Sequence, residues 1–201
     1  MDQLAERITQ VLQKRVFLEL EASGRHVHLT KEDALKLFGH PLTEKKPLSQ
    51  PGQFACNERV SLITPKGRID RVAVLGPERE ESQVELSLTD CVTLGVRAPI
   101  RPSGKVKDTP GITVEGPLGS ITLAQGVIAA QRHIHMTPED AQARGVQDKD
   151  VVRLRVFTQR PLVFEDVLVR VSPKYRTFAH LDYDEANACG FQKGDLGMIV
   201  P

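Results

Sequence analysis

Tryptophan is absent from this chain of 201 residues, and aromatic residues make up only 4% of it. A core with so few large rings must be built from Val, Leu and Ile, and β-branched residues favour strands. No run of about 18 apolar residues occurs, which argues against a membrane-spanning helix. The N-terminus lacks the apolar core of a signal peptide. We therefore expect a soluble, cytoplasmic protein.

The chain also has few cysteines and almost no net charge. Cys56, Cys91 and Cys189 stand singly, without Cys-x-x-Cys spacing. A thiolate zinc site is therefore not expected, and we interpret them as small buried packing residues in a reducing compartment. The net charge is +1, and no basic arm with interleaved aromatics occurs. Composition thus gives no reason to expect a nucleic-acid partner.

Short β-rich runs separated by turn signals dominate the chain. They are Val16–Leu20, Val60–Thr64, Val72–Leu75, Val84–Leu88, Val151–Val156 and Val167–Val171. With 13 Pro and 15 Gly, this pattern predicts compact sheets or barrels joined by tight turns, with a few helices. Residues 1–15 instead have a helical pattern, with an apolar face that includes Leu4, Ile8 and Val11. Two interpretations stay open: a helix docked on its own domain, or a targeting helix that binds a partner.

An internal repeat is the most informative feature. Residues 25–34 read RHVHLTKEDA and residues 132–141 read RHIHMTPEDA, with seven of the ten positions identical. The repeat extends more weakly along the chain: residues 71–77 resemble residues 167–173, and residues 84–95 resemble residues 179–190. The first copy carries extra residues, which we place in a long ordered loop from His40 to Gln53. The sequence therefore predicts two similar modules.

Each copy of the repeat contains a His-x-His pair. Alternate residues of a strand point to the same side, so His26 and His28 would present two imidazoles together, as would His133 and His135. Paired imidazoles on one strand face can begin a zinc or iron site. Because the pair occurs twice at equivalent places, we interpret both copies as metal sites.

The repeat also indicates a third ligand for each site. Aligning Gly95 with Gly190 places Glu85 opposite His180, and both precede an acidic helix start. The predicted ligand sets are His26, His28 and Glu85 in one module, and His133, His135 and His180 in the other. Three protein ligands leave an open position, as in catalytic zinc sites.

Glu32 and Glu139 offer a competing ligand set, because each follows a His-x-His pair in a cupin-like pattern. We favour a structural interpretation. Thr30 and Thr137 would cap helices, Pro138 suits a first helical position, and the acidic residues suit the positive end of the helix dipole. Asp33 and Asp140 could complete reciprocal caps with those threonines.

Three arginines accompany the repeat. Arg25 and Arg132 precede the two His pairs, and we expect each to pair structurally with a carboxylate or carbonyl. Arg79 has Tyr175 opposite it in the second copy. An arginine present in one module only is a candidate for substrate binding, because guanidinium binds phosphate oxygens in bidentate fashion.

The chain resembles the microcompartment-associated phosphotransacylases, the propanediol-utilisation type of phosphate propanoyltransferase, from about Val16 onward. The motifs that carry the resemblance are SGRHVHLT, LSQPGQF, VLGPER, QVELSLTD, PGITVEGPLGSI, VIAAQRHIHMTPEDA and HLDYDEANACG.

The resemblance implies a mainly β fold with short α-helices, in which an internal duplication forms two pseudo-symmetric capped β-barrels. Residues 25–130 would form the first module, and residues 16–24 with residues 131–201 the second. The active site would lie between them and hold two zinc ions on the six ligands already named. Arg79 would contact phosphate, and Ser23 and Ser103 match active-site serines of the family. Residues 1–15 would be a helix that packages the enzyme into a bacterial microcompartment.

The expected function is transfer of a short acyl group between coenzyme A and phosphate at two zinc ions. We expect direct attack by phosphate, a homo-oligomer, and microcompartment shell or cargo proteins as partners of residues 1–15. One alternative is a two-zinc hydrolase, in which water replaces phosphate as the nucleophile. Another is a non-catalytic, metal-stabilised scaffold protein. The residues do not distinguish acetyl from propanoyl, which differ by one methylene.

Overall fold

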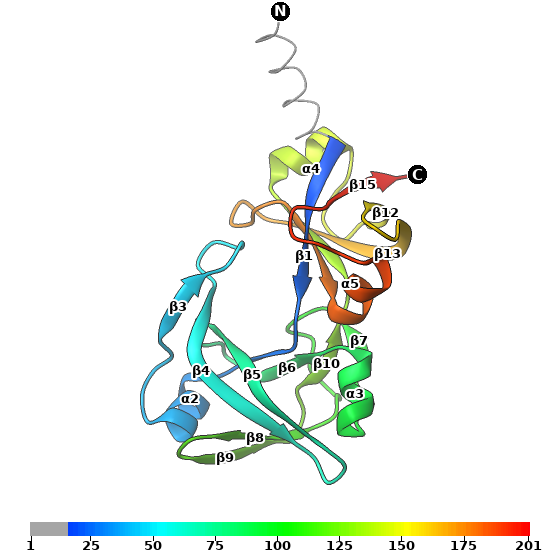
Figure 1. The fold of residues 1–201 in the computed structure, drawn as a ribbon. Coiled ribbons are helices and arrows are strands. Elements are labelled where there is room, and N and C mark those ends of the chain that lie inside the picture. Colours follow the sequence, from blue (N-terminus) through cyan, green and yellow to red (C-terminus); the bar gives the residue numbers. More distant parts are fainter. Residues whose placement is uncertain (1–15) are drawn as a thin grey trace, which may run out of the picture. The chain divides into compact units, whose positions relative to one another are not determined.

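A computed structural model describes residues 16–201, so the N-terminal helix expected over residues 1–15 lies outside the described part. The chain divides into two units (Figure 1). One is continuous and spans Gly24–Gln131, whereas the other combines the N-terminal strand with Arg132–Pro201. The expected fold class, mainly β with short α-helices, is confirmed.

A closed six-stranded barrel forms the discontinuous unit, with strand order β1-β14-β11-β13-β12-β15. Its strands are β1 (Phe17–Ser23), β11 (His133–Met136), β12 (Val151–Phe157), β13 (Leu162–Val171), β14 (Phe178–Asp182) and β15 (Leu196–Val200), and its helices are α4 (Pro138–Arg144) and α5 (Tyr183–Cys189). Strand β1 pairs in parallel with β14 and antiparallel with β15. The first strand of the chain is therefore the one that closes this barrel.

The continuous unit contains a nine-stranded sheet in the order β7-β10-β6-β2-β5-β4-β8-β9, with β3 paired to β4. Its elements are β2 (His26–His28), α2 (Lys31–Phe38), β3 (Glu44–Pro47), β4 (Phe54–Ile63), β5 (Arg68–Gly76), β6 (Gln83–Leu86), α3 (Leu88–Leu94), β7 (Ile100–Arg101), β8 (Ile112–Gly116), β9 (Gly119–Leu123) and β10 (Val127–Ala130). The extra segment from His40 to Gln53 contains the exposed strand β3. It thus adds a strand to the sheet where a loop was expected.

Both units are built around aliphatic side chains, as the scarcity of aromatic residues requires. Leu29, Leu37 and Leu62 are fully buried in the continuous unit, and Ile134 and Leu154 in the barrel unit. The three cysteines are buried and unbridged, which confirms their interpretation as packing residues. Burial is the main free-energy term that favours such cores.

The internal repeat corresponds to the same strand pairing in both units. Strand β2 lies parallel to β5 and antiparallel to β6, and β11 lies parallel to β13 and antiparallel to β14. In register, His26 stands opposite Glu85, and His133 stands opposite His180. The duplicated segments therefore give the two units a common framework around their histidine pairs.

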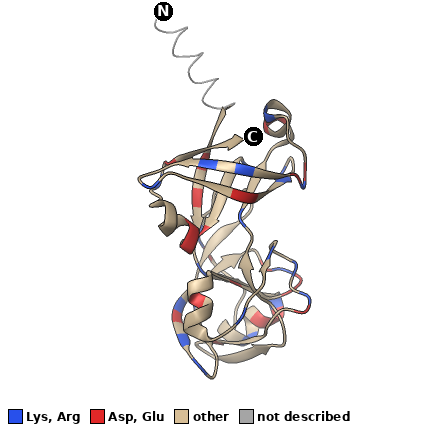
Figure 2. Cartoon of the chain, turned by 90° about the vertical axis from the view of Figure 1, so that its right-hand side faces the viewer, with Lys and Arg blue, Asp and Glu red and all other residues tan. Residues whose placement is uncertain are grey.

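Acidic and basic residues are interspersed along the ribbon of each unit (Figure 2), in keeping with a net charge of +1. Within residues 16–201, no helix combines the length and apolarity needed to cross a membrane.

Candidate metal centres

The same local arrangement holds the candidate ligands in both units. Arg25, just before the first His pair, lies 3.3 Å from Asp90, and Arg132, just before the second, lies 2.8 Å from Glu185. These two carboxylates belong to the capping boxes that start α3 and α5. The expectation that both arginines pair structurally is therefore confirmed. Arg25 thereby links the segment that carries His26 and His28 to helix α3, which directly follows the strand of Glu85. Arg132 links the second His pair to helix α5, which follows the strand of His180, in the same way.

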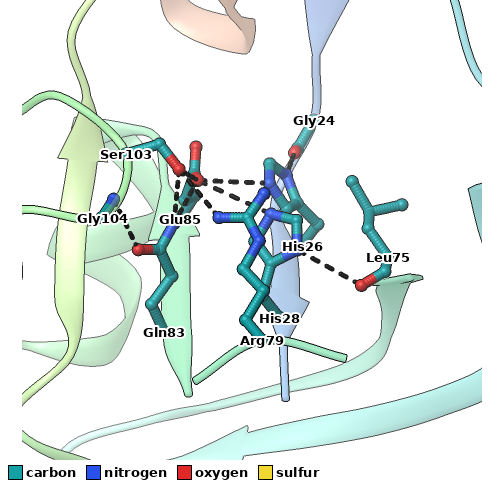
Figure 3. Close-up of polar contacts among 9 residues, drawn as sticks. All are labelled: Gly24, His26, His28, Leu75, Arg79, Gln83, Glu85, Ser103 and Gly104. Atoms are coloured by element: carbon teal, nitrogen blue, oxygen red, sulfur yellow. Dashed lines mark hydrogen bonds and ion pairs between the residues drawn. The ribbon is translucent and has the colours of Figure 1, made fainter. Parts of the chain in front are cut away.

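His26, His28 and Glu85 come together in the continuous unit (Figure 3). Atom Oε1 of Glu85 lies 3.6 Å from Nε2 of His26 and 3.7 Å from Nε2 of His28. The other ring nitrogens face backbone carbonyls: Nδ1 of His26 lies 2.7 Å from the oxygen of Gly24, and Nδ1 of His28 lies 3.2 Å from that of Leu75. Outer contacts of this kind fix the tautomer and orientation of metal-binding imidazoles.

The electrostatics of this first cluster favour an ionised carboxylate beside at least one neutral imidazole. Burial opposes the charge of Glu85, but His26 and His28 outweigh burial and hold its pKa far below the ordinary value. Burial, with His26 and Arg79 nearby, lowers the pKa of His28 well below its ordinary value. For His26, burial lowers the pKa and Glu85 raises it, and the net result is a raised pKa. Metal ligands must be deprotonated, so Glu85 and His28 already meet that condition.

A polar network joins this cluster to Arg79. Nη1 of Arg79 donates to Oγ of Ser103 at 3.1 Å, and that hydroxyl donates to Oε1 of Glu85 at 2.7 Å. The side-chain amide of Gln83 donates to the same oxygen of Glu85 at 2.5 Å and accepts from the backbone of Gly104 (Figure 3). The structure thus groups Arg79 and Ser103 with the first candidate triad.

His133, His135 and His180 form the second cluster, in the barrel unit. Nδ1 of His135 lies 3.2 Å from Nε2 of His180. Burial lowers the pKa of His135 to about 3, and His133 and Arg170 contribute to the shift. The ring of Tyr175, the residue that aligns with Arg79, lies 4.1 Å from the ring of His135. His135 is therefore a neutral imidazole packed beneath an aromatic ring.

Both clusters fit a divalent cation by spacing and chemistry. The potential ligand atoms of each triad lie within 4.8 Å of one another. Tetrahedral zinc with bonds of about 2.0–2.1 Å to nitrogen separates its ligand atoms by roughly 3.3 Å, and His135 and His180 are 3.2 Å apart. Nε2 of His135 is buried without a hydrogen-bond partner. Of the two ring nitrogens, however, Nδ1 is the one that lies beside Nε2 of His180, so the spacing assigns Nδ1, and not Nε2, as the ligand atom of His135.

The glutamates at the helix starts are not part of the clusters. Glu32 is exposed and pairs with Lys36 one turn along α2, at 2.7 Å. Thr30 and Thr137 cap α2 and α4, and Pro138 occupies the first turn of α4, as expected. The reciprocal caps differ from the prediction. The carboxylates of Asp33 and Asp140 accept hydrogen bonds from Ser82 and Thr177, and these hydroxyls in turn accept from the backbone of the capping threonines.

The remaining candidate, Ser23, is the last residue of β1, where it stands beside Asp182 in the barrel unit. Two polar residues of the clusters were missed by sequence reasoning, Gln83 and Glu21. Gln83 lies two positions before Glu85 on one strand, so the alternation of side chains could have revealed it. Glu21 lies 3.4 Å from His180 through a long-range strand pairing, for which the sequence gives no signal.

The sequence of the chain is similar to those of known proteins. Residues 19–192 match the family model described as phosphate propanoyltransferase. A phosphate propanoyltransferase of Clostridioides difficile (strain 630) is 51% identical over 202 residues, covering 100% of this chain and 97% of the relative. One from Enterococcus faecalis is 50% identical, covering 100% and 95% respectively. One from Sebaldella termitidis is 54% identical, covering 90% and 86%. The chain therefore belongs to the phosphate propanoyltransferase family.

Proposed function

We propose that this protein is a phosphate acyltransferase that interconverts a short-chain acyl-CoA and phosphate with an acyl phosphate and coenzyme A, using one zinc ion in each cluster. The main support is the occurrence of two triads, one buried and one partly buried, at equivalent places of a duplicated framework, in a chain that belongs to the phosphate propanoyltransferase family. Each triad offers three ligands, and such sets leave a position open for substrate.

The reaction exchanges one bond at the acyl carbon. A phosphate oxygen forms a bond to the thioester carbonyl carbon as the carbon–sulfur bond breaks, which releases acyl phosphate and the coenzyme A thiolate. Bound zinc would supply Lewis acidity and a partner with high affinity for sulfur. Because phosphate attacks directly in this scheme, no acyl-enzyme forms. Trapping a stable acyl-enzyme from labelled acyl-CoA without phosphate would contradict it.

Arg79 is the residue we assign to phosphate. Its positively charged guanidinium lies near the first cluster and contributes to the lowered pKa of His28. It already donates to Ser103, which orients it toward Glu85 and its network. A planar guanidinium can donate hydrogen bonds to two phosphate oxygens at once. It would thereby hold the nucleophile in position and stabilise its negative charge. Ser103 has a positioning role in this scheme, and Ser23 is proposed as a further substrate contact.

The test measures bound zinc together with phosphate-dependent formation of acyl phosphate. Wild type should hold two zinc ions per chain. His135→Ala should lose the ion of its cluster and most activity. Arg79→Ala should keep both ions but lose about 10²–10³-fold in turnover, the usual cost of removing one preorganised donor. The matched control is Arg97→Ala, because Arg97 is an exposed arginine of the same unit.

Three results would contradict the proposal. Full activity of zinc-free protein would show that the reaction does not need the metal. Consumption of acyl-CoA at equal rate with and without phosphate would identify a hydrolase. Two tightly held zinc ions without turnover of any short acyl-CoA would indicate a scaffold protein.

We also propose that residues 1–15 direct the enzyme to the lumen of a bacterial microcompartment by contacting shell or cargo proteins. Their helical sequence pattern supports this, although they lie outside the described residues. A fluorescent protein fused to residues 1–15 should co-purify with the compartments of a producing bacterium. The same fusion with Leu4 and Ile8 changed to Ser should stay behind, and equal recovery of both would contradict the proposal.

A further inference from the structure

The outward-facing nitrogen of His180 meets a carboxylate from the N-terminal strand. Glu21 and His180 are direct neighbours in the parallel pairing of β1 with β14. Oε2 of Glu21 lies 3.4 Å from Nδ1 of His180. The residues that alternate with them, Leu20 and Leu181, are buried in the barrel core, so Glu21 and His180 share the opposite face of the two strands.

The other nitrogen of His180 faces the cluster, because its Nε2 is the atom 3.2 Å from His135. The ring therefore bridges Glu21 and the candidate metal position. The first cluster uses the same orientation: Nε2 of His26 and of His28 faces Glu85, and Nδ1 of each faces a backbone carbonyl. For His180 the group beside Nδ1 is instead the side-chain carboxylate of Glu21.

The charges of the two triads explain why a carboxylate matters at this place. A triad of two histidines and a glutamate brings one negative charge to a divalent cation, whereas three neutral histidines bring none. A carboxylate that accepts the Nδ1 proton makes the opposite nitrogen a stronger donor to a metal and fixes the tautomer. Glu21 thus supplies, from outside the second triad, the negative charge that Glu85 supplies within the first.

We propose that Glu21 is a positioning residue for His180: it holds the proton on Nδ1, orients Nε2 toward the cluster, and strengthens the binding of a divalent cation by His133, His135 and His180. This inference rests on the proposed function, which places zinc at that cluster. Loss of such an outer partner typically lowers metal affinity about 10–100-fold.

Zinc affinity is the primary measurement, made by titrating metal-free full-length protein in competition with a chromophoric chelator. Glu21→Gln removes the charge and Glu21→Ala removes the acceptor. Each should weaken one of the two zinc sites by about 10–100-fold and leave the other unchanged. The matched control is Glu19→Gln, because Glu19 alternates onto the same strand face and pairs in register with Phe178. It should bind both ions as wild type does.

A second measurement needs no metal. The ¹⁵N chemical shifts of the His180 ring in metal-free protein should show the proton on Nδ1 in wild type and in Glu19→Gln, with that preference lost in Glu21→Ala. Wild-type affinity of both zinc sites in the two Glu21 variants would overturn the inference, as would an equal loss in Glu19→Gln or a wild-type proton on Nε2. Wild type that binds no zinc at all would instead overturn the proposed function.

Discussion

At the scale of the residue, Asp182 in the barrel unit is a carboxylic acid whose pKa is raised by the fold. Its side chain accepts from the backbone of Glu185 and caps α5. Burial, together with the carboxylates of Glu185 and Asp184, raises its pKa to about 6. The unfolded value is about 3.9. Between these two values the folded protein binds a proton that the unfolded chain does not, so this residue adds stability as the pH falls.

We therefore predict that Asp182→Asn changes the pH dependence of stability. Asn caps helices as well as Asp does, and it does not titrate. The free energy of unfolding of wild type, relative to the variant, should rise as the pH is lowered from 7 to 4 and should be least favourable above pH 6. Urea denaturation of both metal-free proteins across this range measures the difference. A difference that stays constant with pH would contradict the prediction.

The candidate triads show how far single residues could be predicted. The His-x-His spacing gave the pairs, because strand alternation is local, and the repeat alignment gave Glu85 and His180, which the structure does bring to those pairs. Gln83 was missed although its spacing from Glu85 contained the signal. Glu21 could not have been found, because its contact with His180 depends on which strand lies beside β14, a choice made by the whole barrel.

At the scale of the element, a bridging hydroxyl secures the start of the helix after each His pair. Oγ of Ser82 accepts from the backbone of Thr30 at 2.9 Å and donates to Asp33 at 2.5 Å, and Thr177 bridges Thr137 and Asp140 in the other unit. Helix starts are readable from sequence because a cap is a short-range motif. The hydroxyls were not foreseen, because they come from distant segments.

Ser82→Ala should therefore lower the free energy of unfolding by about 1–2 kcal/mol, because it leaves a backbone N–H and a carboxylate of the helix start without their shared partner. Ser120→Ala is the matched control, because Ser120 is exposed in β9 and should change stability by less than about 0.5 kcal/mol. Denaturant titrations of the two variants at equal zinc concentration decide the matter. Equal stability of Ser82→Ala and wild type would show that the bridge contributes nothing.

At the scale of the whole molecule, the barrel unit depends on a strand far from the rest of its sequence. Strand β1 fills the position between β14 and β15, and its Leu18 and Leu20 are buried in the barrel core. Removing one strand from a closed barrel exposes two edges and part of the core. The duplication was readable from sequence, but the strand that closes the barrel lies outside the repeated segments and entered only through the family resemblance.

We predict that a variant beginning at Gly24 loses the barrel and the capacity of the cluster His133, His135 and His180 to bind zinc, whereas a variant beginning at Val16 keeps both. Residues 24–131 should retain the protected amides of their own sheet in the shorter variant, because that unit is continuous in sequence. Hydrogen exchange followed by mass spectrometry, with zinc analysis of the same samples, separates the two units. Slow exchange in β14 and β15 of the variant beginning at Gly24 would contradict this dependence.

The discontinuous barrel also sets an order of events during synthesis. The ribosome makes β1 first and its neighbours β14 and β15 last, with the complete continuous unit in between. At about 5–20 residues per second, β1 must wait roughly ten to thirty seconds for its neighbours. Until β14 and β15 have been made, Leu18 and Leu20 therefore lack the core against which they pack in the folded barrel, so the barrel closes only at the end of synthesis.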